Sequence, residues 1–339
     1  MKVFVAMSGG VDSSVCLYLL KQQGYDVSGI TLKLDDDYDN PIARAKNICD
    51  KLGVKHIVLD YRENFKMEVV EEFNRQIQNG TTPVPCVICN RLIKLGILAE
   101  YCIKQNAKLA TGHYAAIRDN KIYRAKDILK DQTHFLCNVK KEVIPYLIFP
   151  LGDYLKSEVF RIAKEQHLVN VDLYKESQDV CFFNGKTYNE YIANLNIMED
   201  IGDIIHIKSN KKLGQHHGLL RYTIGQRQGL GIAWSEPLYV VKKDYNANIL
   251  YVGEEPCLYA KTLTLKNVNF LVDGIDMTKP FQCKVCLRDK TPLLDAIIRF
   301  EDKTASAIVN LSQPARAITK GQWCVMYLDD VLIGGGEIC

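Results

Sequence analysis

The 339-residue sequence lacks the long apolar run, about 18 residues or more, that a membrane-spanning helix needs. It also lacks low-complexity stretches and repeats, and a mean hydropathy of -0.10 with 47% hydrophobic residues excludes disordered and fibrous classes. Charge imbalance is small, because 43 Lys and Arg face 40 Asp and Glu, a net charge of +3. This balance neither requires nor excludes a nucleic-acid partner, which has to be inferred from local sites.

The sequence also lacks the pattern of a signal peptide, because Met1 to Ala6 leads directly into a Gly-rich turn without a small-residue cleavage site. We therefore expect a strand at this position and a cytoplasmic protein. The twelve cysteines are spread over the chain and are expected to be mostly reduced thiols. Any disulfide in such a protein is expected to be catalytic.

The first third of the chain alternates short apolar runs with helix-length amphipathic segments, which predicts a parallel sheet covered by helices. The helix after the first strand is expected over Val11 to Leu20. Beyond residue 200 the pattern becomes strand-like, with a hairpin over 238–252. Length predicts two or three cores, and we expect domains over 1–195, 196–256 and 257–339. The expected strands of the first domain are Val3 to Met7, Val27 to Leu32, His56 to Leu59 and Lys108 to Thr111.

The segment from Ala6 to Ser14 lies between a predicted strand and a predicted helix. Its backbone N–H groups and hydroxyls converge at a helix N-terminus, which predicts an anion site. The Gly-Lys-Ser/Thr ending of a Walker loop is absent, and the Gly9-Gly10 pair does not fit the Rossmann spacing. A tight turn with an Asp cap is the alternative interpretation.

Two cysteine segments are candidates for chemistry. Cys86 and Cys89 form a C-x-x-C bracketed by prolines and followed by a helical segment expected to begin near Arg91. A thiol at a helix N-terminus has a lowered pKa, which favours a reactive thiolate. Cys181 stands between polar and aromatic residues, in the segment 177–183. Either segment alone is compatible with a structural role, because free cysteines are often buried.

The motif Ser-Gly-Gly-Val-Asp-Ser, residues 8–13, resembles the PP-loop of ATP pyrophosphatases. With it, the whole chain is similar to the tRNA 2-thiouridylases of the MnmA/TrmU type, through further blocks in the same order. These blocks are 110–115, 130–132, the segment around Cys181, and 222–231. The resemblance implies an α/β fold: a parallel-sheet PP-loop ATPase domain (Rossmann-like, HUP), a small central β-rich domain and a C-terminal β-barrel that binds tRNA.

The resemblance also implies roles for individual residues. Cys89 is the expected nucleophile, and Cys181 is the expected carrier of a persulfide, with a Cys89–Cys181 disulfide formed during catalysis. The expected ATP contacts are Ala6, Met7, Ser8, Gly9, Gly10, Val11, Asp12, Ser13, Leu32 and Gly112. The expected tRNA contacts are Val84, Pro85, Cys86, His113, Lys130, Asp131, Gln132 and Gln322.

The implied reaction uses ATP and Mg²⁺ to adenylate the 2-oxygen of the wobble uridine, so that AMP becomes the leaving group when sulfur enters carbon 2. Asp12 is the carboxylate expected nearest to the metal. Cys89 either attacks the Cys181 persulfide to release hydrosulfide or attacks the base itself, and both routes stay open. The implied partners are tRNAs for Lys, Glu and Gln and a relay of sulfur from a cysteine desulfurase.

Cys86 departs from the family pattern, which commonly has Asp at this position. An iron–sulfur cluster on Cys86, Cys89 and Cys181 is therefore one hypothesis, and a merely tolerated Cys86 is the other. A second C-x-x-C, Cys283 and Cys286, lies in a strand-like stretch where residues three apart point to opposite faces, which disfavours a zinc site.

Two other functions remain compatible with parts of the sequence. An amidating or ligating synthetase with a PP-loop would also adenylate an oxygen but would need no paired thiols. A non-catalytic RNA-binding protein would need neither the loop chemistry nor the cysteines.

Overall fold

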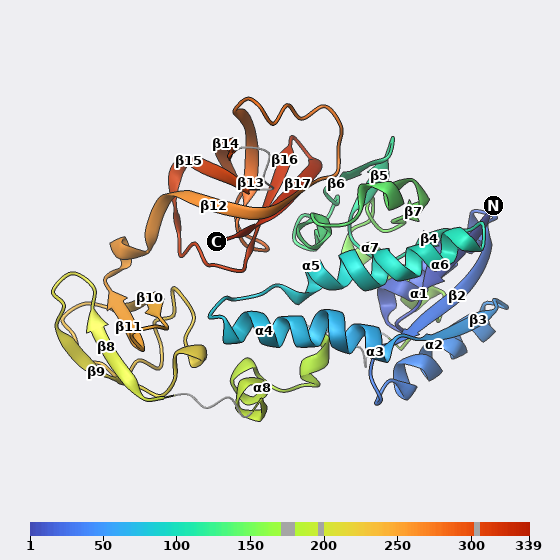
Figure 1. Cartoon of the computed structure of the whole chain (residues 1–339). Helices are drawn as coiled ribbons and strands as arrows, with labels where there is room; N and C mark the ends of the chain where they lie inside the picture. Colours follow the sequence, from blue (N-terminus) through green and yellow to red (C-terminus); the bar gives the residue numbers. More distant parts are fainter. Residues whose placement is uncertain (171–179, 196–199, 302–305) are drawn as a thin grey trace.

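The computed structural model describes residues 1–170, 180–195, 200–301 and 306–339. Its strands form sheets of five, four and eight strands. Figure 1 shows the N-terminal α/β unit at one end, the small central unit at the other, and the C-terminal barrel beside the long helices that lie between them. Among the described residues, no helix is both long and apolar enough to span a membrane. The predicted α/β class with two further β units is confirmed.

The five-stranded sheet is parallel throughout, in the order β3-β2-β1-β4-β7. The chain moves outward from β1 to β2 and β3 and then returns to the other side of β1 at β4, so the carboxyl end of β1 lies at a topological switch point. Ligands of open α/β sheets bind at such a point. The strands are β1 Lys2–Ala6, β2 Asp26–Lys33, β3 His56–Asp60, β4 Lys108–Ala110 and β7 Leu147–Ile148.

Helix α1, Val11–Gln22, is buried on two sides. The predicted apolar stripe that includes Val11 and Val15 packs with residues of α7, Lys156–Glu165. The side of α1 that carries Leu17 and Leu20 packs on β1. The predicted helix is therefore confirmed, but the stripe faces another helix, because both faces of α1 are apolar.

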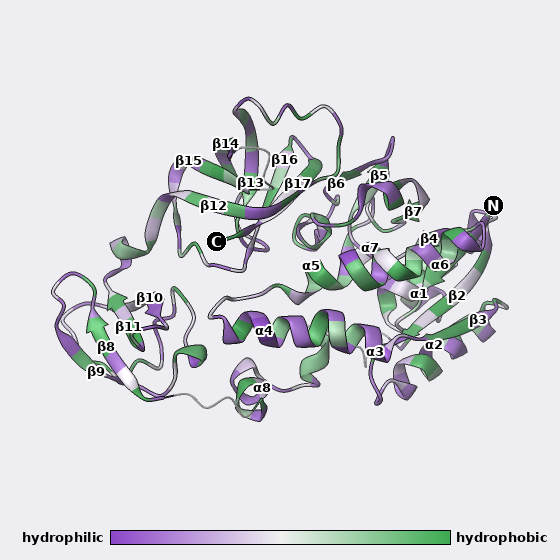
Figure 2. Cartoon of the chain, viewed as in Figure 1, coloured by the Kyte–Doolittle hydropathy of each residue, from purple (hydrophilic) through white to green (hydrophobic). Residues whose placement is uncertain are grey.

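The helices of the N-terminal unit include two long ones that run side by side (Figure 1). In the first, the π-helical turns Lys66–Glu71 join α3 to α4, so the helix is continuous over 62–78. In the second, the π-helical turns Asn90–Ile97 join α5 to α6, so the helix is continuous over 85–104. Helices α2 and α4 alternate hydrophilic and hydrophobic residues (Figure 2), as expected for helices with one buried face. The remaining helices are α2 Asp39–Lys51, α3 Arg62–Phe65, α4 Glu72–Gln78, α5 Pro85–Cys89, α6 Leu98–Lys104 and α8 Tyr188–Asn194.

The start of the second long helix differs from the prediction. The helix begins at Pro85 and not near Arg91, so Cys86 and Cys89 lie within its first turns. Proline favours this position because its ring already has a helical φ and the missing N–H has no intrahelical partner there. Short 3₁₀ turns connect other elements: Thr133–Leu136, Lys141–Tyr146, Cys181–Phe183, Leu219–Arg221 and Glu255–Leu258.

The central unit is a four-stranded sheet in the order β10-β11-β8-β9. The predicted hairpin is confirmed as β10 and β11, which are antiparallel. Apolar residues of this hairpin and of the segment that precedes it form a separate small core. The strands are β8 Gly202–His206, β9 Lys212–His216, β10 Tyr239–Asp244 and β11 Ile249–Gly253.

The C-terminal unit is a six-stranded barrel that closes through the pairing of β12 with β17. The other half of the same edge of β17 pairs with β6 of the N-terminal unit, at Leu332 and Ile122. One hydrophobic core therefore continues from the barrel into the N-terminal unit. The barrel strands are β12 Tyr259–Phe270, β13 Phe281–Cys286, β14 Leu294–Glu301, β15 Ser306–Arg316, β16 Trp323–Leu328 and β17 Val331–Ile338. The sheet is extended by β6 Lys121–Tyr123 and β5 Ala116–Arg118 of the N-terminal unit.

The second C-x-x-C lies on β13, and its two thiols point to different cores. Cys283 packs inside the barrel, whereas Cys286 packs in the core shared with the N-terminal unit. This confirms the expected opposite orientation. No group of three potential metal ligands occurs among the described residues, so this pair has no partners for a zinc site.

Candidate active site

The loop after β1 is held together by the hydroxyl groups of its own serines. Ser13 and Ser14 donate hydrogen bonds from Oγ to the carbonyl of Gly10 at 3.1 and 2.6 Å. The N–H of Ser8 donates to Oγ of Ser13 at 3.3 Å. Gly9 has a φ of +72°, a conformation that side chains rarely adopt. The loop thus presents backbone N–H groups at the N-terminus of α1, as an anion site requires.

A cavity of about 270 Å³ opens at this loop and contains seven of the ten predicted ATP contacts. Gly9, Gly10 and Val11 belong to the same loop and helix end without lining the cavity. Apolar side chains from β2 and α6 suit a base, whereas the loop suits phosphates. The lining residues are Ala6, Met7, Ser8, Asp12, Ser13, Ile30, Leu32, Leu34, Tyr38, Lys94, Leu98, Thr111, Gly112, His113 and Gln132.

Gly112 brings the segment after β4 against the loop. A Cβ at this position would lie 3.1 Å from the Asp12 carbonyl carbon and 3.2 Å from the Ser13 nitrogen. Such contacts are tighter than ordinary packing allows, so a larger residue would push the segment away from the loop. The PP-loop and the segment that contains Gly112, both predicted to contact ATP, are therefore packed directly against each other.

Asp12 is engaged by two residues that sequence reasoning missed. Nζ of Lys156 donates to both carboxylate oxygens at 2.7 Å, and the Tyr114 hydroxyl donates to Oδ1 at 2.9 Å. Only 8% of the Lys156 side chain is exposed. A magnesium ion would have to displace Lys156 to bind the Asp12 carboxylate, so the predicted role of Asp12 next to the metal finds no support in this geometry. Mg²⁺ fits the site through ATP phosphates.

Replacing Lys156 with Met is expected to lower the free energy of unfolding by about 3 kcal/mol, because Asp12 loses its partner in a largely buried pair. The Asp12→Asn, Lys156→Met double variant removes both charges and is expected to recover most of the loss. Urea unfolding measures both effects. Lys126→Met is the matched control, since its ion pair with Glu158 is exposed to solvent and contributes little to stability. Equal losses in both lysine variants would contradict the prediction.

The two predicted catalytic cysteines differ in burial. Cys89 is 6% exposed, whereas Cys181 is exposed at the start of its 3₁₀ turn. Both are free thiols in this structure. Burial raises the pKa of the Cys89 thiol to about 12, although the positive charge of Lys94 opposes the change. The predicted lowering of this pKa by the helix N-terminus is therefore wrong for Cys89, because desolvation outweighs it.

Cys181 lies within electrostatic reach of Cys89. The charge of Cys181 contributes to the raised pKa of Cys89. Phe182 and Phe183 anchor the turn by packing on Phe73 of α4, with ring centroids 5.2 and 5.7 Å apart. The exposed thiol is thus positioned by a buried aromatic cluster. Ser177, Gln178 and Asp179, which precede it in the predicted motif, lie outside the described residues.

Comparison with known proteins places this site in a family. The model for the tRNA methyl transferase HUP domain matches residues 1–185, the tRNA methyl transferase PRC-barrel domain 190–254, and the aminomethyltransferase β-barrel domain 260–338. The chain is similar over 351 residues, at 42% identity and covering 100% of both chains, to the tRNA-specific 2-thiouridylase MnmA of Hydrogenobaculum sp.. The chain belongs to the MnmA family.

Two further relatives support the assignment over the full length. The MnmA of Aquifex aeolicus is 41% identical over 100% of this chain and 99% of its own. The MnmA of Persephonella marina is 39% identical over 100% of both. The resemblance seen in the ordered sequence blocks is thereby confirmed, and the family assignment covers the barrel as well as the PP-loop domain.

The tRNA contacts expected from the MnmA family fall in different environments. His113 and Gln132 line the nucleotide cavity, and burial lowers the pKa of His113 to about 3, so its ring is neutral near pH 7. Asp131 is 10% exposed and accepts hydrogen bonds from Ala125 and Thr133. Lys130 lies beside it and is partly exposed.

Gln322 connects the barrel to the loop before α5. Its side-chain amide donates to the Thr82 carbonyl at 2.9 Å, and the Thr82 N–H donates to the Lys320 carbonyl at 2.8 Å. These bonds hold the loop that leads into Val84, Pro85 and Cys86. Gln322 therefore positions the segment expected to face the target base.

The cysteines do not form a metal site in this arrangement. Among the described residues, no three His, Cys, Asp or Glu side chains are grouped closely enough to hold a metal ion. Cys86, Cys89 and Cys181 thus do not fit an iron–sulfur cluster as they are placed here. Cys86 is exposed and Cys89 is buried, although both lie on α5.

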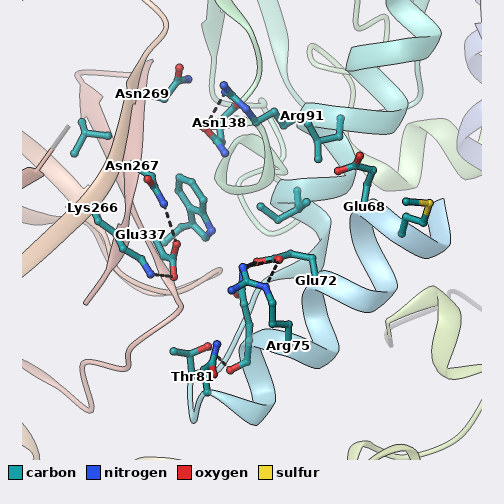
Figure 3. A pocket seen from close by; sticks show the side chains of 17 residues that line it. Glu68, Glu72, Arg75, Thr81, Arg91, Asn138, Lys266, Asn267, Asn269 and Glu337 are labelled. Carbon is teal, nitrogen blue, oxygen red and sulfur yellow. Dashed lines mark hydrogen bonds and ion pairs between the residues drawn. The ribbon is translucent and has the colours of Figure 1, made fainter. Parts of the chain in front are cut away.

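A second and larger cavity, of about 620 Å³, lies between α4, α5 and the barrel (Figure 3). None of the residues predicted to bind ATP or to carry sulfur lines this second cavity. Several of its charged side chains pair with neighbours: Arg75 with Glu72 at 2.6 Å, and Lys266 with Glu337 at 3.0 Å. The nucleotide cavity, although smaller, is therefore the candidate active site.

Proposed function

We propose that this protein is a tRNA 2-thiouridylase, which uses ATP to replace the 2-oxygen of the wobble uridine with sulfur. One observation carries the proposal: the PP-loop cavity and the two candidate thiols, Cys89 and Cys181, share Lys94, which lines the cavity and acts electrostatically on both thiols. A synthetase that delivers nitrogen needs no such thiols, and a non-catalytic RNA-binding protein needs neither feature.

The first half-reaction is adenylation. The uridine 2-oxygen attacks the α-phosphate of ATP, an O–P bond forms, and the bond to the β-phosphate breaks so that pyrophosphate leaves with the electron pair. The loop N–H groups would bind the phosphates of ATP and neutralise the charge that pyrophosphate carries away, and Mg²⁺, when bound with ATP, would supply further positive charge. The base then carries AMP, a much better leaving group than the original oxygen.

The second half-reaction delivers sulfur from a Cys181 persulfide. In one route the Cys89 thiolate attacks the inner sulfur, a Cys89–Cys181 disulfide forms, and the hydrosulfide released attacks carbon 2 as AMP leaves. In the other route Cys89 attacks carbon 2 and AMP leaves. The outer sulfur of the Cys181 persulfide then displaces Cys89 from carbon 2, and the freed Cys89 thiolate attacks the inner sulfur, which releases 2-thiouridine and leaves the Cys89–Cys181 disulfide. Where the disulfide forms, an external thiol reductant has to restore both thiols before the next turnover.

Reconstitution tests the proposal directly. Full-length protein is incubated with tRNA, ATP, Mg²⁺ and sulfide, which takes the place of the released hydrosulfide, and the nucleosides are analysed by mass spectrometry. We expect 2-thiouridine only when ATP is present, with one pyrophosphate per thiouridine. Pyrophosphate release without 2-thiouridine would favour the synthetase, and no release with bound tRNA would favour the RNA-binding protein.

The finer features of the proposal follow the family. We infer tRNAs for Lys, Glu and Gln as substrates, a relay from a cysteine desulfurase as the sulfur source, and a cytoplasmic location. We place the domain borders at 195/196 and 256/257.

Cysteine plus a desulfurase should replace sulfide in the same assay, and tRNAs with another wobble base should stay unmodified. The alternative iron–sulfur cluster predicts iron and brownish absorbance in anaerobically purified protein.

A further inference from the structure

Lys94 is the feature of this site that neither sequence motif explains. It lies five residues after Cys89, in the π-helical turns Asn90–Ile97, and lines the nucleotide cavity. Among the described residues that line the nucleotide cavity, it is the only Lys or Arg. His113, the other potential cation there, is neutral near pH 7 because burial lowers its pKa to about 3.

The local backbone is suited to this placement. At Gly96, a Cβ would lie 2.5 Å from the carbonyl oxygen of Arg91, five residues earlier, so the wide turn requires glycine there. π-helical turns within an α-helix are frequent at functional sites, because the extra residue re-aims the side chains around it. Here they follow the catalytic cysteine and precede α6, whose Leu98 lines the same cavity.

The charges around Lys94 come from several elements. On its own helix Cys86 and Cys89 face it; Cys181 comes from the 3₁₀ turn, and Tyr38 precedes α2. His113, after β4, also experiences its charge. Burial alone would lower the pKa of Lys94, but its electrostatic interactions with the three cysteines and Tyr38 raise it, so the ammonium is retained.

ATP brings several negative charges into a cavity that has one basic side chain. Asp12 lines the same cavity, but its carboxylate is already neutralised by Lys156. Resting on the proposed function, we propose that Lys94 is a catalytic residue for both half-reactions: its ammonium contacts the α-phosphate during adenylation and AMP departure, and it stabilises the Cys89 thiolate. A cation placed where charge develops lowers the barrier in a water-poor site.

The adenylation role is tested with Lys94→Met, which keeps the length of the side chain, and Lys94→Arg, which keeps the charge. Single-turnover pyrophosphate release with tRNA is expected to fall about 100-fold in the Met variant and much less in the Arg variant, with a smaller change in KM for ATP. Lys46→Met is the matched control, since Lys46 pairs with Asp50 on the surface of α2. Unchanged release in Lys94→Met overturns this role.

The thiolate role has a readout that does not depend on thiolation. The alkylation rate of Cys89 by iodoacetamide is followed against pH by mass spectrometry of its peptide. Loss of the neighbouring cation raises the pKa of Cys89, so at pH 8 the thiolate fraction falls, and we expect alkylation about tenfold slower in Lys94→Met. Lys94→Arg should alkylate at nearly the wild-type rate. Equal rates in the wild type and Lys94→Met overturn this role.

The two readouts separate this inference from the proposed function. If wild-type protein makes no 2-thiouridine but Lys94→Met slows Cys89 alkylation, the thiolate role stands and the assigned reaction fails. If wild-type protein thiolates tRNA and Lys94→Met matches it in both pyrophosphate release and alkylation, the reaction stands and Lys94 has no catalytic role.

Discussion

With cysteine and a desulfurase as the sulfur source, Cys181→Ser is expected to lose 2-thiouridine formation by at least roughly 1,000-fold while keeping tRNA-stimulated pyrophosphate release. A serine oxygen cannot carry a persulfide, so sulfur delivery stops. Adenylation depends on the PP-loop cavity, which Cys181 does not line. Nucleoside mass spectrometry and a pyrophosphate assay on the same samples measure the two half-reactions separately.

The control for this variant is Cys339→Ser, which replaces another exposed free thiol outside the site. It is expected to retain both activities. The folding of Cys181→Ser is checked by its unfolding midpoint, which should change little because the thiol is exposed while Phe182 and Phe183 anchor the turn. Retained thiolation in Cys181→Ser would rule out the persulfide role.

Gly9→Ala is expected to reduce pyrophosphate release about 100-fold, because the PP-loop has to move away from α2. The new Cβ would lie 2.7 Å from Cβ of Arg44, 2.9 Å from the carbonyl of Pro41 and 3.0 Å from the nitrogen of Ala45. Two of these atoms are backbone atoms of α2 and cannot rotate away. The φ of +72° adds roughly 1 kcal/mol of strain for a residue other than glycine.

Gly24→Ala separates the two causes. Gly24 also has a positive φ, +81°, but no atom lies within 4 Å of the position that an alanine Cβ would take there, so only the backbone strain applies. We expect a loss of stability of about 1 kcal/mol with unchanged pyrophosphate release. If Gly9→Ala releases pyrophosphate as fast as Gly24→Ala, the loop does not need its present position against α2.

Several parts of the fold could be predicted because the deciding signal is local. Short apolar runs that alternate with amphipathic segments predicted β1 to β4, and apolar residues at helical spacing predicted α1. The turn between β10 and β11 follows from its polar residues. The two-residue strand β7 was missed, because Leu147 and Ile148 are too few to show a period.

The contacts between domains could not be predicted in this way. Pairing of β6 with β17 joins Ile122 to Leu332, and the Gln322 side chain bonds to Thr82, 240 residues away. Nothing near either residue in the sequence indicates its partner. Such contacts arise when already formed sheets and helices bury their remaining apolar faces against one another.

By itself, the sequence determined the PP-loop, because turn and helix-start preferences act over a few residues. Cys89 and Cys181 were predicted as the residues that handle sulfur through the family resemblance. The tertiary structure decided how these groups behave. Burial raises the pKa of Cys89 despite its helix N-terminus, and Asp12 is neutralised by Lys156, 144 residues away. Desolvation and charge pairing depend on which distant segments surround a group, so they are properties of the folded chain.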